Sequence, residues 1–304
     1  MVKDNVMKRK ELFCGQYINK ILIAGLIISL LCNVFVAIYY RNNILKIFRF
    51  NTAIVSTNIP KQSTKESGSD KLSTFEKDLL QFNKEPYLIS NGKISTNHIF
   101  TRTIKILILG NSISLTGVPD EEPDKTPRGL VSSDVNHDYA HILMNRISKD
   151  KDVNIKYSIV NSADFERTFE KRPFNFATLS KADVKNPDYL IVQLGENVFN
   201  YAAKTYEKLL EERYSEIFQR FPYATKIVCI PFYPDADKQR IITKIAIDNQ
   251  AFLIDLSHLG NGTDKKNFAK SEKKYKQEGV DVHPGNYGMK NIADTIYSLF
   301  NVII

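Results

Sequence analysis

The chain has 304 residues, 43% of them hydrophobic, and a formal net charge of +8. That length is enough to bury a sizeable core, and it fits one domain with an appendage better than two full domains. Residues 1–50 hold eight lysines and arginines against two acidic residues, so +6 of the charge lies there and +2 belongs to residues 51–304. A nucleic-acid partner is therefore not expected, because the rest of the chain has no basic and aromatic run typical of a nucleic-acid groove.

An apolar run without charges occupies residues 21–40. About 20 residues of helix cross a hydrocarbon core of about 30 Å, so the run predicts a transmembrane anchor. A cleaved signal peptide is the alternative, but its apolar region is usually about 7–15 residues long and ends at a small-residue cleavage site. Here Tyr39-Tyr40-Arg41 follows instead.

The flanking segments set the expected orientation of this anchor. Five basic residues precede the run and three follow it closely, so the positive-inside rule predicts a cytoplasmic tail at 1–20. The rest of the chain would then lie in the periplasm or outside the cell. Residues 41–73 become polar and lack the apolar content to pack, which predicts a linker, and residues 74–304 form the predicted globular domain.

Within that domain, apolar strand patterns alternate with helical ones. Strands are predicted at 104–109, 154–160, 188–194, 226–231 and 251–255, and helices at 138–149, 204–220, 237–249 and 287–300. Alternation of this kind gives right-handed βαβ units. The predicted fold is therefore α/β: a three-layer α/β/α sandwich with a five-stranded parallel sheet of the flavodoxin-like type.

The most informative stretch is 104–114, a buried strand that ends in Gly110-Asn-Ser-Ile-Ser114. Ser112 lies just past the carboxyl end of the strand, where open α/β sheets have their ligand crevices. The alternative is an ordinary turn in which Ser112 or Asn111 caps the next helix.

A serine becomes a nucleophile only when a base takes its proton, and His283 is the best-placed candidate. A third group orients the base, and an acyl-transfer intermediate needs donors aimed at its oxyanion. Asp281 and Asn197 are the candidates for these two roles. No Cys or His spacing typical of a metal site occurs, and neither a metal nor a cofactor is expected.

Three segments together resemble the SGNH (GDSL-type) hydrolase family over about residues 104–300. Gly110-Asn-Ser-Ile-Ser114 resembles the block with the nucleophile, Gly195-Glu-Asn197 resembles the Gly-x-Asn block, and Val282-His-Pro284 resembles the block with the catalytic histidine. The resemblance implies a nucleophilic Ser112 with His283 as general base. It also implies an oxyanion hole made by the Ser112 N–H, the Asn197 amide and a backbone N–H near Glu166.

The chain departs from that family pattern in three places. The segment after the second strand, residues 160–167, lacks the usual glycine, and Asp281 lies two residues before His283 where the family has its acid three before. Either Asp281 still reaches the imidazole, or a Ser-His dyad works with a carbonyl that orients the base. Asn111 and Glu196 are predicted to bind the substrate. The replacement of the usual aspartate by Asn111 is expected to affect support of the loop rather than the chemistry.

The expected function is a membrane-anchored serine esterase that removes acyl groups, in particular O-acetyl groups, from a cell-envelope glycan. An O-acyltransferase that uses the same acyl-enzyme and a lipid esterase or lysophospholipase are the enzymatic alternatives. A degenerate module that binds glycan or protein without turnover is the third.

Overall fold

The computed structural model describes residues 88–96, 98, 101–118, 124–275 and 278–304. They belong to a unit that spans Asp70–Ile304. The predicted tail, anchor and linker (1–20, 21–40 and 41–73) lie outside the described residues. No helix within the described ranges is long and apolar enough to span a membrane.

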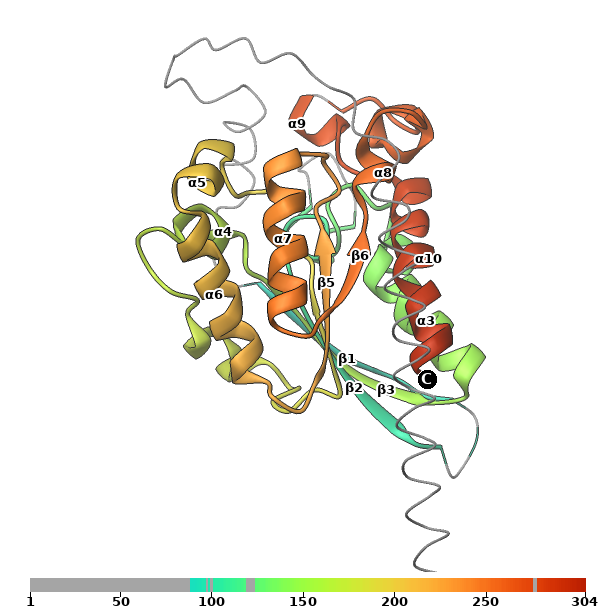
Figure 1. Cartoon of the computed structure of the whole chain (residues 1–304). Helices are drawn as coiled ribbons and strands as arrows, with labels where there is room; N and C mark the ends of the chain where they lie inside the picture. The colour runs from blue at the N-terminus through green and yellow to red at the C-terminus, as the bar shows by residue number, and fades with distance from the viewer. Residues whose placement is uncertain (1–87, 97, 99–100, 119–123, 276–277) are drawn as a thin grey trace, which may run out of the picture. The chain divides into compact units, whose positions relative to one another are not determined.

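A mixed sheet of six strands, in the order β1-β3-β2-β4-β5-β6, forms the centre of the domain (Figure 1). Strands β2 to β6 are parallel, and β1 pairs antiparallel with β3, with Ile89 opposite Val160. The parallel core is confirmed, but the predicted count of five strands is wrong because it omits the antiparallel edge strand. The strands are β1 (Ile89–Ile94), β2 (Thr103–Gly110), β3 (Asn154–Asn161), β4 (Tyr189–Val192), β5 (Thr225–Ile230) and β6 (Phe252–Asp255).

Helices cover both faces of the sheet. One face packs against α3 (Tyr139–Lys151) and α10 (Asn286–Ile303), which lie side by side. The other packs against α4 (Ala163–Thr168), α5 (Asn200–Thr205), α6 (Glu207–Arg220) and α7 (Ala236–Asp248). The shorter elements are α8 (Ser257–Gly260), α9 (Glu278–Asp281), η1 (Val135–His137), η2 (Phe176–Lys181), η3 (Lys265–Asn267) and η4 (Ala269–Ser271).

The alternation of side chains along β2 explains the two cores. Ile106 and Ile108 belong to the core under α3 and α10, whereas Leu107 and Leu109 belong to the core under α4 to α7. Successive side chains of a strand point to opposite faces, so a strand covered by helices on both sides needs an unbroken apolar run. That run is what predicted the strand.

Two of the predicted helices have an acidic residue at their amino-terminal end. Asp138 is the N-cap of α3 and accepts a hydrogen bond from the His141 N–H, and Asp237 lies in the first turn of α7. The predicted helix at 204–220 is instead two helices, because Tyr206 between α5 and α6 leaves the helical conformation with φ −116° and ψ 33°.

The loops that follow β2, β3 and β4 lie together at the carboxyl ends of these strands. Gly110 pairs with Asn161 at the ends of β2 and β3, and the Ser162 N–H donates to the Gly110 carbonyl at 2.6 Å. Parallel strands place their carboxyl ends together, so side chains from residues 111, 166 and 196 can meet there.

Candidate active site

The loop after β2 and the loop before α10 bring a serine and a histidine together. Ser112 Oγ lies 3.2 Å from His283 Nε2, although 171 residues separate the two in the chain. Both side chains are buried. A serine hydroxyl within hydrogen-bond reach of an imidazole nitrogen is the geometry that a nucleophile and its base require.

A main-chain carbonyl orients the imidazole. His283 Nδ1 lies 2.6 Å from the Gly279 carbonyl oxygen. A carbonyl only accepts, so Nδ1 carries the proton and Nε2 presents its lone pair to the Ser112 hydroxyl. Burial lowers the pKa of His283 to about 4, and the bond to the Gly279 carbonyl opposes that shift. The imidazole is therefore neutral at pH 7, which is the form a general base needs.

Asp281, the predicted orienting acid, has a different partner. Its Oδ1 accepts from the Tyr275 N–H at 2.8 Å, and the Gly279 carbonyl takes the position at the imidazole that the acid would occupy. The four residues from Val280 to His283 form a tight turn, with the His283 N–H donating to the Val280 carbonyl at 3.0 Å. This turn aims the ring back at Gly279. Sequence reasoning left this arrangement open as an alternative but could not locate the carbonyl, because no residue type marks it.

The histidine loop is fixed on its other side by an aromatic ring. The Tyr233 ring meets the His283 ring edge to face at 6.4 Å, and the Tyr233 hydroxyl donates to the Val282 carbonyl at 3.2 Å. Tyr233 follows β5 and was not among the predicted site residues.

The nucleophile turn depends on glycine and on an asparagine. A Cβ on Gly110 would lie 1.9 Å from Ser114 Oγ, so no larger residue fits there. Asn111 Oδ1 accepts from the Ile113 N–H at 3.1 Å, which closes the turn around Ser112. The Asn111 amide is therefore part of the loop, and its other contacts are to two buried glutamates.

Those glutamates, Glu166 and Glu196, form a polar network under the turn. Asn111 Nδ2 donates to Glu196 Oε2 at 2.6 Å and to Glu166 Oε1 at 3.2 Å. Glu196 Oε1 also accepts from Gln193 Nε2 at 2.6 Å and from the Phe232 N–H at 3.0 Å. Both oxygens of Glu196 are thus used inside the protein. Asn111 and Glu196, the predicted substrate contacts, are bonded to each other under the nucleophile turn.

The Glu166 carboxylate holds the Gly195-Glu-Asn197 loop. It accepts from the Gly195 N–H, from the Asn197 N–H at 3.3 Å and from Asn197 Nδ2 at 2.6 Å. Gly195 itself has φ +133°, a conformation that other residues rarely adopt. Burial and then the charge of Glu196 raise the pKa of Glu166 to about 7, while the bonds from Gly195 and Asn197 lower it. The groups of Gly195 and Asn197 that bond to Glu166 are all N–H donors, so they match the ionised form of its carboxylate.

The same contacts define what could bind an oxyanion. A primary amide has two N–H bonds, so Asn197 Nδ2 keeps one after its bond to Glu166. Among the described residues, no acceptor pairs with the Ser112 main-chain N–H. The Glu166 N–H, predicted as a further donor, is used at the start of α4, where it donates to the Ser162 carbonyl at 3.4 Å. Glu166 therefore contributes its side chain to the site and not its main chain.

The long insert after the nucleophile packs against it. The Leu130 N–H donates to the Ser112 carbonyl at 2.8 Å, and Thr116 forms an antiparallel bridge with Arg128. The Arg128 guanidinium is fully buried and donates to the carbonyls of Ser132 at 2.7 Å and Thr126 at 2.9 Å. The described part of the insert thus packs beside Ser112, and the buried Arg128 guanidinium stabilises it.

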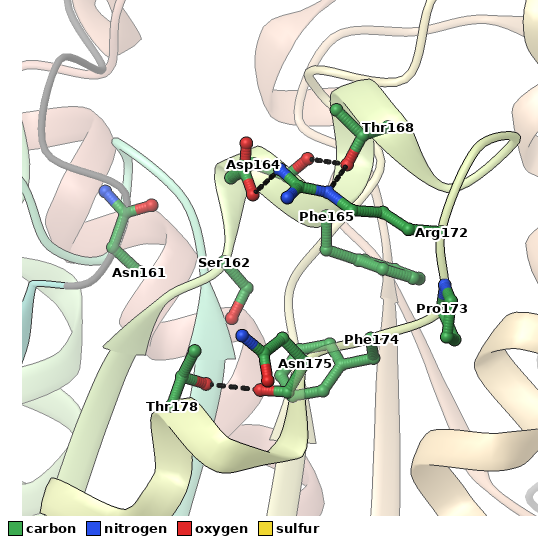
Figure 2. Close-up of a pocket in the computed structure, with 10 residues that line it drawn as sticks. All are labelled: Asn161, Ser162, Asp164, Phe165, Thr168, Arg172, Pro173, Phe174, Asn175 and Thr178. Atoms are coloured by element: carbon green, nitrogen blue, oxygen red, sulfur yellow. Dashed lines mark hydrogen bonds and ion pairs between the residues drawn. The ribbon is translucent and has the colours of Figure 1, made fainter.

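A separate hollow lies beside α4, lined by the residues that Figure 2 labels. Its volume is about 20 Å³, roughly the space of one water molecule. Arg172 crosses it and contacts Asp164 at 2.5 Å and Thr168 Oγ1 at 3.0 Å (Figure 2). Neither Ser112 nor His283 lines this hollow.

No family model and no curated protein matches the chain. Several solved structures are similar to it. A psychrotrophic esterase, EstA, from Pseudoalteromonas sp. has 15% identity, with 65% of this chain and 96% of that chain covered and a TM-score of 0.42. A lipase/acylhydrolase from Enterococcus faecalis has 17% identity, with 65% and 95% covered and a TM-score of 0.42. A family 3 carbohydrate esterase from Clostridium thermocellum has 17% identity, with 65% and 94% covered and a TM-score of 0.43.

Proposed function

We propose that the chain is a serine esterase in which Ser112 and His283 act as a dyad. The proposal rests on one observation above all: His283 lies between the Ser112 hydroxyl at 3.2 Å and the Gly279 carbonyl at 2.6 Å. A neutral imidazole held in this tautomer is ready to take the serine proton. The resemblance of the three sequence blocks to the SGNH family agrees with this chemistry.

The proposed reaction has two halves. Ser112 Oγ attacks the carbonyl carbon of the ester while its proton moves to His283 Nε2. The C–O bond to the alcohol then breaks, Nε2 returns the proton to the alcohol oxygen, and the acyl group remains on Ser112. Water attacks this acyl-serine in the same way, which releases the acid and restores the hydroxyl.

The negative charge of each tetrahedral intermediate falls on the former carbonyl oxygen. The Ser112 N–H and the free N–H of the Asn197 amide are the proposed donors to it. Donors fixed before the reaction stabilise the charge without reorganisation, and in a buried site each one contributes more than it would in water. Glu166 holds the Asn197 amide through its bond at 2.6 Å and so acts as a positioning residue.

For the substrate we propose an acylated, in particular O-acetylated, glycan of the cell envelope. The support is the predicted location: residues 21–40 carry no charge and are long enough to anchor the chain, and the basic residues before them favour a cytoplasmic amino terminus. The domain would then face envelope polymers from a tether of polar residues.

Turnover of p-nitrophenyl acetate by the full-length protein tests the proposed reaction. We expect Ser112→Ala and His283→Ala each to lower kcat/KM by about 10³-fold or more, because neither member of such a pair works alone. Ser298→Ala and His258→Ala are the matched controls, since both side chains are exposed and lie outside the site. Circular dichroism and thermal melts verify that each variant is folded. Turnover that persists in Ser112→Ala would contradict the proposal.

A further inference from the structure

A lysine-rich segment lies directly before the histidine loop. Residues 265–274, called here the lysine segment, contain η3 and η4 and carry five exposed lysines. In Figure 1 the segment lies between α8 and α10, at the end of the sheet where the strands terminate. The five are Lys265, Lys266, Lys270, Lys273 and Lys274.

The segment is attached to the catalytic histidine through its main chain. The Ala269 N–H donates to the His283 carbonyl at 2.8 Å, and the Gly285 N–H donates to the Asn267 carbonyl at 3.1 Å. Phe268 and Pro284 form an antiparallel bridge between the same two stretches. The lysines are therefore fixed beside the loop that carries the base.

The acids near these lysines are engaged with main-chain groups. Asp264 Oδ1 accepts from the Lys266 N–H at 3.1 Å. Glu272 caps α10, because its two oxygens accept from the Asn286 and Tyr287 N–H groups, each at 2.9 Å. Within the described part of the chain, Lys265, Lys266 and Lys274 form no ion pair with a carboxylate. The segment thus carries five exposed lysines, and Glu272 is the one acidic residue within its ten positions.

Some cations elsewhere on the domain are paired across helices. Arg240 of α7 bonds to Glu207 of α6 through both of its terminal nitrogens, and Lys244 of α7 bonds to Glu211 of α6 at 2.8 Å. The lysine segment, with five exposed lysines within ten residues, is a concentrated positive surface beside the proposed active site.

The aromatic side chains in the segment and directly after it are covered. Phe268 and Tyr275 are each 7% exposed. Lys270 Nζ lies 5.5 Å from the centre of the Phe268 ring, and Lys273 Nζ lies 5.1 Å from that of Tyr275. A surface that inserts into a membrane presents large apolar side chains, and this one presents ammonium groups over buried rings. A hydrated, negatively charged polymer fits it better than a lipid layer does.

We propose that the lysine segment binds an anionic polysaccharide and that the ester to be cleaved is carried by that polymer. This inference rests on the proposed esterase function. Negative groups that repeat along the polymer would meet several ammonium groups at once, while an acyl group on the same chain reaches Ser112. Such a surface raises the local substrate concentration and the association rate by about 10- to 1000-fold, and the gain falls steeply with ionic strength.

The test compares two O-acetylated polymers of equal acetyl content, anionic polygalacturonate and uncharged xylan. Released acetate gives kcat/KM for each with the full-length protein, and the polygalacturonate/xylan ratio cancels any general loss of activity in a variant. The segment variant is Lys265→Gln, Lys266→Gln, Lys270→Gln and Lys274→Gln together. The control variant removes the same charge from exposed lysines elsewhere: Lys105→Gln, Lys149→Gln, Lys204→Gln and Lys208→Gln.

We expect the wild type and the control variant to prefer polygalacturonate, and the segment variant to lose about tenfold or more of that ratio. The wild-type preference should also disappear near 1 M salt, where the Debye length is about 3 Å. A wild type without the preference, a segment variant that keeps it, or a control variant that loses it equally would overturn the inference.

A lipid surface is the competing partner. The lipid test measures hydrolysis of p-nitrophenyl butyrate with phosphatidylglycerol in nonionic micelles. The segment binds lipid, and the inference fails, if phosphatidylglycerol stimulates the wild type but not the segment variant while the polygalacturonate/xylan ratio is equal in both. Hydrolysis of p-nitrophenyl acetate separates the two proposals. If it is absent, the esterase function fails and the inference with it; if it is present without a polymer preference, only the inference fails.

Discussion

Replacement of Asp281 by asparagine separates a dyad from a triad. In the structure, Asp281 Oδ1 accepts from the Tyr275 N–H at 2.8 Å, and His283 Nδ1 has the Gly279 carbonyl at 2.6 Å. An asparagine keeps an oxygen that can accept the Tyr275 bond. The variant should therefore retain both the loop and the orientation of the imidazole.

The two accounts differ by orders of magnitude. Where an aspartate does orient the catalytic histidine, its replacement by asparagine lowers kcat by about 10⁴-fold, which corresponds to about 5.4 kcal/mol of transition-state stabilisation. Here we expect kcat/KM of Asp281→Asn on p-nitrophenyl acetate to stay within about threefold of the wild type. Asp281→Ala, which deletes the acceptor for the Tyr275 N–H, should cost about 1–3 kcal/mol of stability in a denaturant titration. A loss of about 10³-fold in a folded Asp281→Asn protein would refute the dyad.

Replacements of three residues, Asn197, Glu166 and Arg128, test the network and the insert. Asn197→Ala should lower kcat by about 10²- to 10³-fold. If KM changed by a larger factor than kcat, that result would argue against an oxyanion role. Asn200→Ala is the control, since Asn200 is exposed on α5. In the wild type, kcat/KM should fall as Glu166 is protonated near pH 7 and fall again as His283 is protonated near pH 4. Glu166→Gln should abolish the first fall and keep the second. An unchanged pH profile would contradict the positioning role of Glu166. Glu166 has a pKa of about 7 in the folded protein and of about 4.5 in the unfolded chain. The free energy of unfolding of the wild type should therefore fall, relative to that of Glu166→Gln, as the pH rises from about 4.5 to about 7. Denaturant titrations at each pH would measure this difference. Arg128→Met should lower the free energy of unfolding by about 1–3 kcal/mol, since the buried Ser132 carbonyl loses its donor, and a stability equal to that of the wild type would contradict this.

The parallel core could be predicted from the sequence because its strands are covered on both faces. The run from Ile104 to Leu109 has almost no polar residue, so its identity as a central strand is plain. Strand β1 was missed because it contains Asn91 and Gly92, residues typical of turns, and its side chains are only partly buried. The break at Tyr206 was missed because no glycine or proline marks it.

The site could be predicted only where side-chain type carries the chemistry. Ser112 and His283 were identified from their motifs, and the structure brings them together. The Gly279 carbonyl has no counterpart in residue type, so spacing alone pointed to Asp281. Glu166 was placed in the site for its main chain, since burial of a glutamate side chain is unusual and gives no pattern along the sequence.

Covalent labelling tests the central claim, that Ser112 is the nucleophile, most directly. The full-length protein would be treated with the p-nitrophenyl ester of an alkylphosphonate, and peptide mass spectrometry would locate the adduct. The account predicts one phosphonyl group on Ser112, formed much more slowly in His283→Ala and absent in Ser112→Ala. An adduct on another residue, or no adduct in a protein that hydrolyses p-nitrophenyl acetate, would contradict it.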